Sequence, residues 1–424
     1  MSEPRPHASQ LPAEANLRHL KDQAKDLLKA GHAPSLAAAQ FQIARQYGFP
    51  SWPKLKAHVL ERTNARKLKQ AISQDDLAEV RLLIAKHPEL KAAPIGYGGA
   101  GPLTWASECR GTAEPSSARL RIAEWLIQNG SDVHEHGDAP LMRASLSGSR
   151  APMMELLVRY GADVNAAWHG SYPIIFAPCE ALDPTALAWL LQHGADPNCG
   201  DELRWRSVAK SHPGSALDYL LGTYMRDREA LHASIGLLQD AGGFTRYDEP
   251  GIIATIRGDV DRVRHLLHED PLLIRRKYPS LPIGTTAARM LTLKGATLLH
   301  VAAEFGQVEV ATLLLDTGAD VNEPALVEAD GQGGQSPIFH AATQNGDFGI
   351  GVVRLLLSRG ADLNLRCLLP GHYERPEELF EGTVLDYARL FPGTENRTLE
   401  ALRRAGSSPR GTWSPQTHSS SNIP

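Results

Sequence analysis

The sequence predicts an all-α fold: a solenoid of stacked helix pairs, irregular and with loop insertions, preceded by a small three-helix N-terminal module. Three observations lead to this prediction. A helix–glycine–helix unit of about 33 residues recurs along the chain. Its short ending, Gly-Ala-Asp-x-Asn, recurs with it. A chain of 424 residues is also long for one compact core. Because such a unit cannot bury its own apolar face, it must stack on copies of itself.

The N-terminal region predicts the module over residues 14–65, after a disordered start at residues 1–13. Apolar residues recur at helical spacing from Leu17 to Leu28 and from Leu36 to Ala44, and each run is followed by a glycine. A third helix is expected from Pro53 to Glu61.

The charge of the chain is unevenly placed. The net charge is −4, but residues 1–69 hold 12 Lys and Arg against 5 Asp and Glu, a balance of +7 that leaves −11 on the rest. A basic arm of this kind can bind nucleic acid or an acidic partner. Because the basic residues are interspersed with apolar ones at helical spacing, we interpret them as solvated helix faces.

One copy of the repeat, Gly295 to Asn322, shows how the unit is built: GATLLHVAAEFGQVEVATLLLDTGADVN. Thr297 can cap the first helix, and Gly306 can end it in the left-handed conformation. Gly318 ends the second, more apolar helix. The Asp and Asn that follow suit a tight turn, since their side chains can bond to nearby backbone.

Other copies repeat both halves of this unit. The second helix and its ending return at Ala123–His134, Met154–Asn165, Leu187–Asn198, Val310–Asn322 and Val352–Asn364, with weaker copies at Gly236–Gly243 and Glu400–Ser408. The start of the first helix returns at Gly101–Ser107, Ala139–Ser145, Tyr172–Ala177, Ser215–Leu220, Ser336–Ala342 and Thr383–Ala388.

With two offset motifs recurring together, the chain resembles the ankyrin-repeat family over residues 66–407. The stretch Thr297–His300 comes nearest to the family's Thr-Pro-Leu-His start, with leucine in place of proline, and the family's second helix closes on Gly-Ala-Asp-Val-Asn. The glycine-to-glycine spacing stretches from 31 residues, Gly130 to Gly161, to 42 residues, Gly318 to Gly360. The resemblance therefore implies an irregular ankyrin-repeat solenoid.

Two segments mark possible beginnings of repeat blocks. Lys69–Pro94 is similar to Ile252–Pro279, and each resembles a divergent first repeat whose polar outer helix shields the end of the core. We therefore predict one block at residues 66–247 and another at residues 248–407. The tail, residues 408–424, lacks apolar periodicity and is expected to be disordered.

The chain is expected in the cytoplasm. Its cysteines, at positions 109, 179, 199 and 367, lie far apart, which fits a reducing compartment. The N-terminus lacks the apolar core of a secretory signal, and no apolar run approaches the roughly 18 residues of a membrane span. The segment Ala44–Val59 resembles one that often precedes ankyrin arrays in bacterial proteins, which implies a bacterial origin.

No cofactor or metal site is expected. Gly96–Gly101 matches the dinucleotide pattern G-x-G-x-x-G, but a helical segment precedes it where a strand is required, so we interpret it as an inter-repeat loop. His134–His136 reads as the surface of a hairpin tip, because no further ligands follow at zinc-like spacing.

No catalytic residues are expected either. Cys179, Cys199 and His193 could meet in space, but nothing orders them as nucleophile and base. His300 is interpreted as a residue that stabilises a turn, because its place in the repeat already explains it.

The resemblance implies that hairpins and first helices line a concave face, and the long insertions of this chain fall at its edge. They are Gly200–Gly214, Arg275–Gly295, Glu323–Gly334 and Arg366–Gly382. Exposed Trp, Tyr and Arg contribute most to binding energy at interfaces. The candidate partner contacts are therefore Trp168, Arg204, Trp205, Tyr278, His372 and Tyr373, each of which could instead pack within its own loop.

The resemblance favours a non-enzymatic scaffold that binds a protein partner through the concave face and the hairpin loops. The alternative is a nucleic-acid-associated adaptor that uses the basic N-terminal module. We expect no membrane association, and a monomer is the default oligomeric state.

Overall fold

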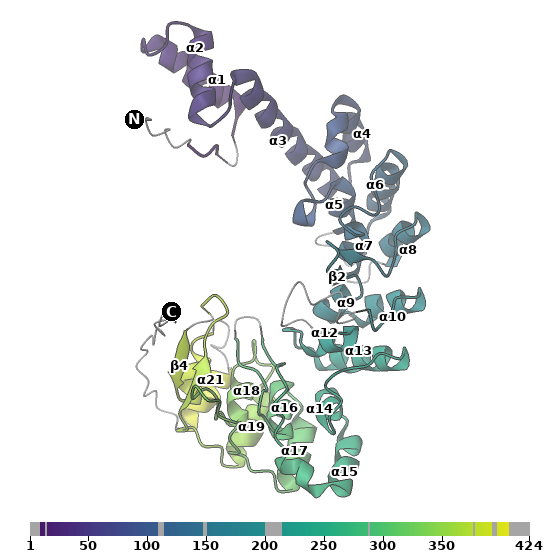
Figure 1. Ribbon diagram of the computed structural model, residues 1–424, viewed down its shortest axis with the longest axis vertical. Helices are drawn as coiled ribbons and strands as arrows, with labels where there is room; N and C mark the ends of the chain where they lie inside the picture. The colour runs from purple at the N-terminus through teal and green to yellow at the C-terminus, as the bar shows by residue number, and fades with distance from the viewer. Residues whose placement is uncertain are drawn as a thin grey trace, which may run out of the picture. The chain divides into compact units, whose positions relative to one another are not determined.

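A computed structural model of the chain describes residues 9–12, 15–108, 114–146, 151–199, 214–286, 289–375, 378–391 and 397–406. Of the two ends expected to be disordered, it describes only residues 9–12. Helices dominate the structure (Figure 1). Across the described residues, no helix has both the length and the apolar composition that a bilayer span requires.

The chain forms two compact units. The first comprises Met1–Ala144 with Pro152–Asp163, and the second Ser145–Ala151 with Val164–Pro424. This division does not coincide with the block boundary expected after residue 247, where α13 and α14 of the second unit contact each other.

The helices up to residue 163 form a three-helix module followed by helix pairs. They are α1 (Leu17–Lys29), α2 (Leu36–Gln46), α3 (Trp52–Ser73), α4 (Leu77–Lys86), α5 (Pro102–Glu108), α6 (Ser117–Gln128), α7 (Ala139–Ser145) and α8 (Ala151–Arg159), with 3-10 helices η1 (Pro88–Ala92) and η2 (Tyr97–Gly99).

The third helix of the module is longer than the sequence predicted. α1, α2 and the start of α3 enclose a small core that includes Leu20, Ile43 and Leu55. α3 then continues past Glu61 to Ser73, because no glycine or proline interrupts it, and its second half packs on α4 and α5. The predicted end at Glu61 is therefore wrong, and one helix serves both the module and the first repeat.

The second unit consists of helix pairs and two short hairpins. Its elements are β1 (Ala167–Trp168), β2 (Tyr172–Pro173), α9 (Phe176–Ala181), α10 (Pro184–Gln192), α12 (Ala216–Leu221), α13 (Arg228–Asp240), α14 (Ile252–Arg257), α15 (Val260–Glu269), η3 (Pro271–Arg275), α16 (Leu298–Glu304), α17 (Val308–Asp316), α18 (Pro337–Ala342), α19 (Ile350–Ser358), β3 (Cys367–Pro370), β4 (Leu379–Gly382), α20 (Val384–Ala388) and α21 (Arg397–Arg404). β1 pairs antiparallel with β2, and β3 with β4.

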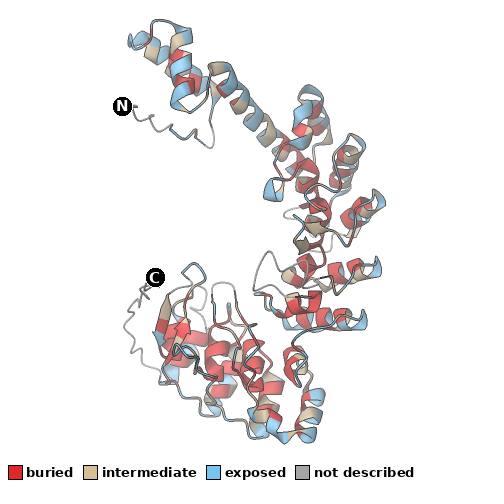
Figure 2. Cartoon of the chain, viewed as in Figure 1, coloured by how far each residue is buried: buried red, intermediate tan, exposed pale blue. Residues whose placement is uncertain are grey.

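These pairs stack in two layers. First helices contact first helices, as α16 contacts α18 and α18 contacts α20, while second helices such as α15, α17 and α19 contact one another. Figure 2 shows that burial is concentrated on the first helices. Every residue of α16, α18 and α20 is buried, whereas α17 and α19 are buried along one side. A helix that is apolar all round must lie between other elements, which is the arrangement stacking provides.

The recurring Gly-Ala-Asp-x-Asn ending links one repeat to the next. In the copies that contain Asp196, Asp320 and Asp362 the aspartate accepts the backbone N–H two residues on, as Asp320 does from Asn322 at 2.9 Å. The asparagine reaches the following repeat: the side-chain amide of Asn322 donates to Gly360 O at 3.2 Å and accepts from Asp362 N at 2.7 Å. Asn165 and Asn198 make the same pair of bonds. This ladder is the physical reason for the recurrence.

One repeat of the first unit replaces this asparagine with histidine and compensates. Asp138 accepts the backbone N–H of Asp163 at 3.0 Å and contacts the ring of His134 at 3.2 Å. Burial raises the pKa of Asp138, and its two hydrogen bonds oppose that shift. The ladder thus survives the substitution by a different donor–acceptor pair.

The two segments interpreted as divergent first repeats have the same local structure. Asp76 and Asp259 cap α4 and α15, and a proline-initiated 3-10 helix follows each of these helices. Leu90 and Leu273 of those 3-10 helices are fully buried.

Candidate functional site

Three of the four long insertions lie together in the second unit. Leu326 N donates to Gly295 O at 3.0 Å, which joins the first insertion to the second. Gly333 N donates to Leu368 O at 2.9 Å, which joins the second to β3 in the third. The fourth insertion, Gly200–Gly214, lies outside the described residues except for its last glycine. We call the three joined segments (Arg275–Gly295, Glu323–Gly334 and Arg366–Gly382) the insertion surface.

The insertion surface carries exposed apolar side chains from each of its segments. Met290 is 36% exposed, Leu326 43%, Val327 62% and Tyr373 53%. Several large apolar side chains with this much exposure on one surface are typical of an interaction site, where a partner covers them. Beside them lies a small pocket of about 120 Å³, whose lining includes Lys294 and Glu328, an ion pair at 2.8 Å.

The candidate contacts predicted from the sequence differ in their exposure and in whether the structure describes them. Tyr373 is exposed, and it stacks on His372, whose ring in turn stacks on Phe391. Trp168 is half-buried in the β1–β2 hairpin. Arg204 and Trp205 lie outside the described residues.

Tyr278 requires a correction, because its exposed fraction is 0%. Its hydroxyl donates to Pro250 O at 2.8 Å, and its backbone pairs with Ala296. The ring therefore anchors the base of the first insertion and offers no surface to a partner.

A buried ionic network holds the insertion surface from below. Glu304, at the end of α16, lies 2.6 Å from the Nη2 atom of Arg289, 2.8 Å from Nη2 of Arg226 and 2.8 Å from Nδ1 of His340. Gln344 donates to the same carboxylate at 2.9 Å. Each of these charged side chains is at most 3% exposed.

The two arginines also bond to the insertion itself. Arg289 donates to Gly284 O at 2.6 Å, and Arg226 donates to Thr285 O at 3.0 Å. Since both guanidinium groups are fixed by Glu304, they hold the backbone of the first insertion against α16. The exposed apolar residues therefore lie on joined loops, the first of which has its backbone fixed by this network.

The protonation states in this network follow from burial and charge. Burial opposes ionisation of Glu304, but Arg289, His340 and Arg226 together hold the pKa of its carboxyl well below the ordinary range. Burial lowers the pKa of His340, although Glu304 opposes that shift. His340 is thus a neutral donor to an ionised carboxylate.

His300 has the role that the sequence predicted. Its Nδ1 accepts the backbone N–H of Thr297 at 3.1 Å, which forms a capping box, and its Nε2 lies 3.0 Å from Gln335 O in the next repeat. The ring stabilises the turn and joins two repeats.

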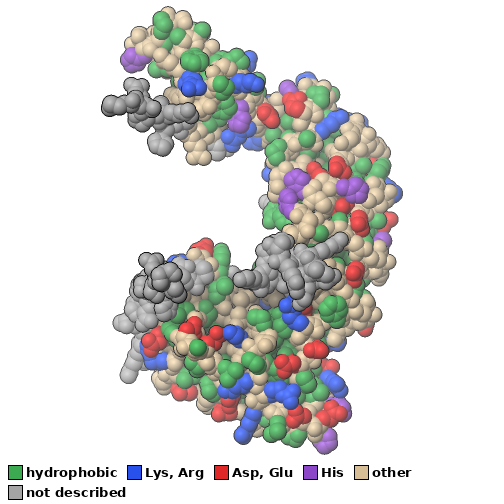
Figure 3. All heavy atoms as spheres, in the orientation of Figure 1, with side chains coloured by type: hydrophobic (Ala, Val, Ile, Leu, Met, Phe, Trp, Pro, Cys, Tyr) green, Lys and Arg blue, Asp and Glu red, His purple; other side chains and the backbone are tan. Residues whose placement is uncertain are grey.

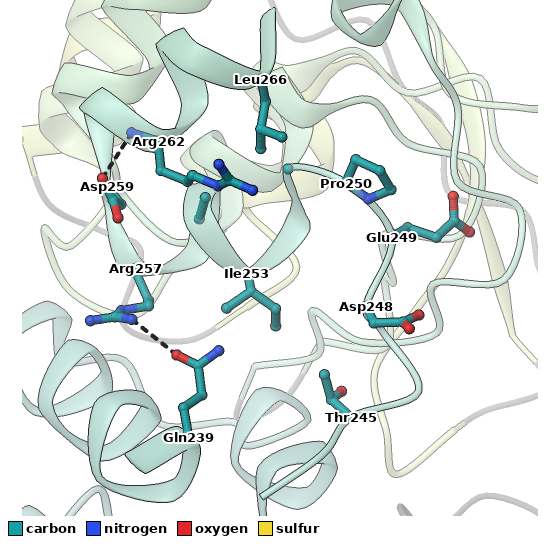
Figure 4. Close-up of a pocket in the computed structure, with 12 residues that line it drawn as sticks. Gln239, Thr245, Asp248, Glu249, Pro250, Ile253, Arg257, Asp259, Arg262 and Leu266 are labelled. Atoms are coloured by element: carbon teal, nitrogen blue, oxygen red, sulfur yellow. Dashed lines mark hydrogen bonds between the residues drawn. The ribbon is translucent and has the colours of Figure 1, made fainter. Parts of the chain in front are cut away.

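The larger pocket of the second unit, about 480 Å³, lies among α13, α14 and α15 (Figure 4). Arg257 donates to Gln239 at 2.9 Å, and Asp259 caps α15. The carboxylates of Asp248 and Glu249 point away from the arginines of the pocket. Its charged groups therefore do not converge on a point where a reacting atom could sit.

The glycine-rich segment Gly96–Gly101 is an inter-repeat loop, as predicted. It contains the 3-10 turn η2, and the start of α5 that follows it is occupied by a side chain of the chain itself. Glu135 accepts from Gly101 N at 2.8 Å and from Thr104 N at 3.2 Å. A phosphate would have to displace this carboxylate.

The other polar residues singled out in the sequence are accounted for by packing. Burial raises the pKa of the Cys179 thiol, and Cys199 adds to the shift, so the thiol is a poor nucleophile. The ring of His193 stacks on that of Trp189, with 3.6 Å between the ring centroids. Within the described ranges, no group of three or more His, Cys, Asp and Glu side chains is placed to hold a metal ion.

The basic side chains of α3 are not confined to one face of the helix. The sequence of α3 contains six Lys and Arg and one Glu. The exposed Lys54 and Lys56 are two positions apart and so face different directions. Figure 3 shows basic and acidic side chains interspersed over the second unit on the face drawn.

Comparison with known proteins identifies the repeats. The family model "Ankyrin repeats (3 copies)" matches residues 251–367, and "Ankyrin repeat" matches residues 136–168. The chain is 33% identical over 97 residues to the B-cell lymphoma 3 protein homolog of Mus musculus, which covers 23% of this chain and 20% of that protein. It is 23% identical over 273 residues to a putative ankyrin repeat protein of Fowlpox virus (strain NVSL), which covers 64% of this chain and 44% of that protein. Both matches span less than half of the relative's length.

Proposed function

Because this chain is an ankyrin-repeat protein, we propose that it binds a protein partner through its insertion surface and catalyses no reaction itself. The observation that supports this most directly is the set of exposed apolar side chains, Met290, Leu326, Val327 and Tyr373, on loops joined by backbone hydrogen bonds. Rigid loops lose little conformational entropy on binding, so more of the contact energy is retained as affinity.

We further propose that the partner also contacts the concave side of the array, next to the insertions. In this proposal the protein acts as a monomer in the cytoplasm. Cys179 and Cys367 are buried and have free thiols, and free thiols fit a reducing compartment. Light scattering of the purified chain at micromolar concentration tests the monomeric state.

The test of partner binding is affinity capture from the cells that naturally express the protein, with the full chain as bait. The double variant Val327→Asp/Tyr373→Asp places two charges on the insertion surface, and we expect it to lose the specifically captured protein. The matched control is Phe41→Asp, which adds a charge at a 51% exposed aromatic of the N-terminal module. Unchanged thermal melts confirm that each bait is folded. Equal capture by wild type and the double variant would overturn the assignment of this surface.

A further inference from the structure

Four side chains, spaced four residues apart in the sequence, form a column that lies outside the insertion surface. They are Trp168 in β1, Tyr172 in β2, and Phe176 and Glu180 in α9. The ring of Tyr172 lies edge to face with that of Trp168 and with that of Phe176, at distances between ring centroids of 6.2 and 5.9 Å. Tyr219 of α12 stacks on Phe176 at 4.3 Å. The column thus ends on a carboxylate framed by aromatic rings from two repeats.

The carboxylate of Glu180 is held by tyrosine hydroxyls. Tyr172 and Tyr219 donate to its Oε2 atom at 2.8 and 2.7 Å. Within the part of the chain that the structure describes, its Oε1 atom receives only the hydroxyl of Tyr224, at 3.4 Å, which is longer than an ordinary O–H···O bond. Tyr224 is 45% exposed, so this side of the cluster is open to solvent.

Among the residues described, no Lys, Arg or His forms an ion pair with Glu180, although most buried carboxylates of the array have such a partner. Burial raises the pKa of Tyr172 and of Tyr219, and the charge of Glu180 adds to both shifts. The tyrosines therefore stay protonated and act as donors to Glu180.

Aromatic faces and an ionised carboxylate attract the same kind of ligand. The quadrupole of an aromatic ring draws a cation to its face, and a carboxylate adds charge-assisted hydrogen bonds. We propose that the cluster of Trp168, Tyr172, Tyr219, Tyr224 and Glu180 is a binding site for a cationic side chain, lysine or arginine, supplied by a partner. The cation donates to Oε1 of Glu180 and covers the rings that line the open side. This site is separate from the insertion surface and does not depend on it.

The test uses single amino acids, so that its outcome does not depend on the identity of a partner. The full chain, with ¹³C-labelled tyrosine rings, is titrated by NMR with N-acetyl-arginine methylamide and, separately, with N-acetyl-lysine methylamide. The matched neutral probes are N-acetyl-citrulline methylamide and N-acetyl-norleucine methylamide. Tyr→Phe variants assign the signals.

We expect the signals of Tyr219 and Tyr224 to shift with at least one cationic probe, and the affinity for its neutral counterpart to be at least about tenfold weaker. Glu180→Gln keeps an acceptor for the tyrosine hydroxyls but removes the charge, and it should weaken binding by about tenfold or more. The buried Tyr387 supplies an internal control that should not shift.

Three results would overturn the proposal: no shift with either cation, equal shifts with cationic and neutral probes, or unchanged binding by folded Glu180→Gln. If Glu180→Gln does not fold, Tyr224→Leu takes its place, because it removes an exposed aromatic ring that the cation would cover and should reduce the affinity measurably. Loss of partner capture by the insertion-surface variant would leave each of these outcomes unaffected.

Discussion

Two glutamates near the ends of first helices, Glu304 and Glu180, have opposite surroundings. Glu304 is 0% exposed and bonded to two arginines, a histidine and a glutamine. Glu180 is half-buried, and within the described ranges its carboxylate is bonded only to tyrosine hydroxyls. The first carboxylate is neutralised from within the chain, whereas the second leaves its charge available to a ligand.

The first unit contains a third such carboxylate, which resembles the first case. Glu108, at the end of α5, is 2% exposed and lies 2.5 Å from Nη2 of Arg143. The guanidinium of Arg143 also lies over the ring of Tyr97. Glu108 and Glu304 are thus each paired with an internal cation. Glu180 differs from both, because no cation pairs with it among the described residues and one side of its site is open to solvent, which favours a binding role over a structural one.

Removing the charge of Glu304 is expected to cause the largest loss of unfolding free energy. Glu304→Gln leaves Arg226 and Arg289 buried without a counter-charge, and breaking a buried ion pair from one side costs about 3–5 kcal/mol. We expect urea denaturation to show a loss of unfolding free energy of this size. The control Asp261→Asn breaks an exposed pair with Arg264 and should leave the midpoint unchanged. Wild-type stability of Glu304→Gln would show that the arginines do not depend on this carboxylate.

Two buried histidines, His340 of the Glu304 network and the neighbouring His300, should make stability depend on pH. Burial, and then the nearby His340, lower the pKa of His300 to about 3. Near neutral and mildly acidic pH the unfolded chain therefore binds a proton that the folded chain does not. Stability is complete above the ordinary pKa of about 6.5 and falls as the pH drops below it.

Between pH 7 and pH 5, His300 alone should remove about 2 kcal/mol of unfolding free energy. His340, whose pKa is also lowered, acts in the same direction. His300→Gln should flatten this pH dependence, measured as the urea midpoint at each pH. Glu304 does not interfere, because the stability it contributes is constant above its ordinary pKa of 4.5 and is lost only as the pH falls below that value. Equal slopes for the variant and the wild type would mean that His300 is protonated in the folded state.

The sequence predicts the repeats well because their signals are local. The caps, the glycines that end the helices and the Asp-x-Asn turn each act within a few residues. The position of the insertions at one edge was implied by the resemblance to ankyrin repeats. The convergence of Arg275–Gly295, Glu323–Gly334 and Arg366–Gly382 was therefore foreseeable as a region.

The networks within that region were not foreseeable. Glu304 draws its partners from Arg226, Arg289, His340 and Gln344, which belong to different repeats and an insertion and share no period. Tyr278 was misjudged because an aromatic residue in a long loop can be exposed or can anchor the loop, and composition does not distinguish these roles. The column that ends at Glu180 did carry a signal, a spacing of four from Trp168 onward.

The tyrosines around Glu180 should contribute less to stability than the arginines around Glu304. Tyr219→Phe removes one hydroxyl that donates to a half-buried carboxylate, and water can replace part of that bond. We expect a loss of about 1 kcal/mol in urea denaturation. The control Tyr373→Phe changes an exposed hydroxyl on the insertion surface and should have no effect. A loss as large as that of Glu304→Gln would place Glu180 among the structural carboxylates.

The smallest effect is expected for removing the charge of Glu180 itself. In Glu180→Gln the amide oxygen still accepts from Tyr172 and Tyr219, and no buried cation is left without a partner. Because an uncompensated charge in a half-buried site is itself unfavourable, the change in unfolding free energy should be below about 1 kcal/mol and could be a gain. The measurement is a urea denaturation series run beside Glu304→Gln in the same buffer. Similar losses in the two variants would erase the difference between the two glutamates and remove the reason for assigning a ligand to Glu180.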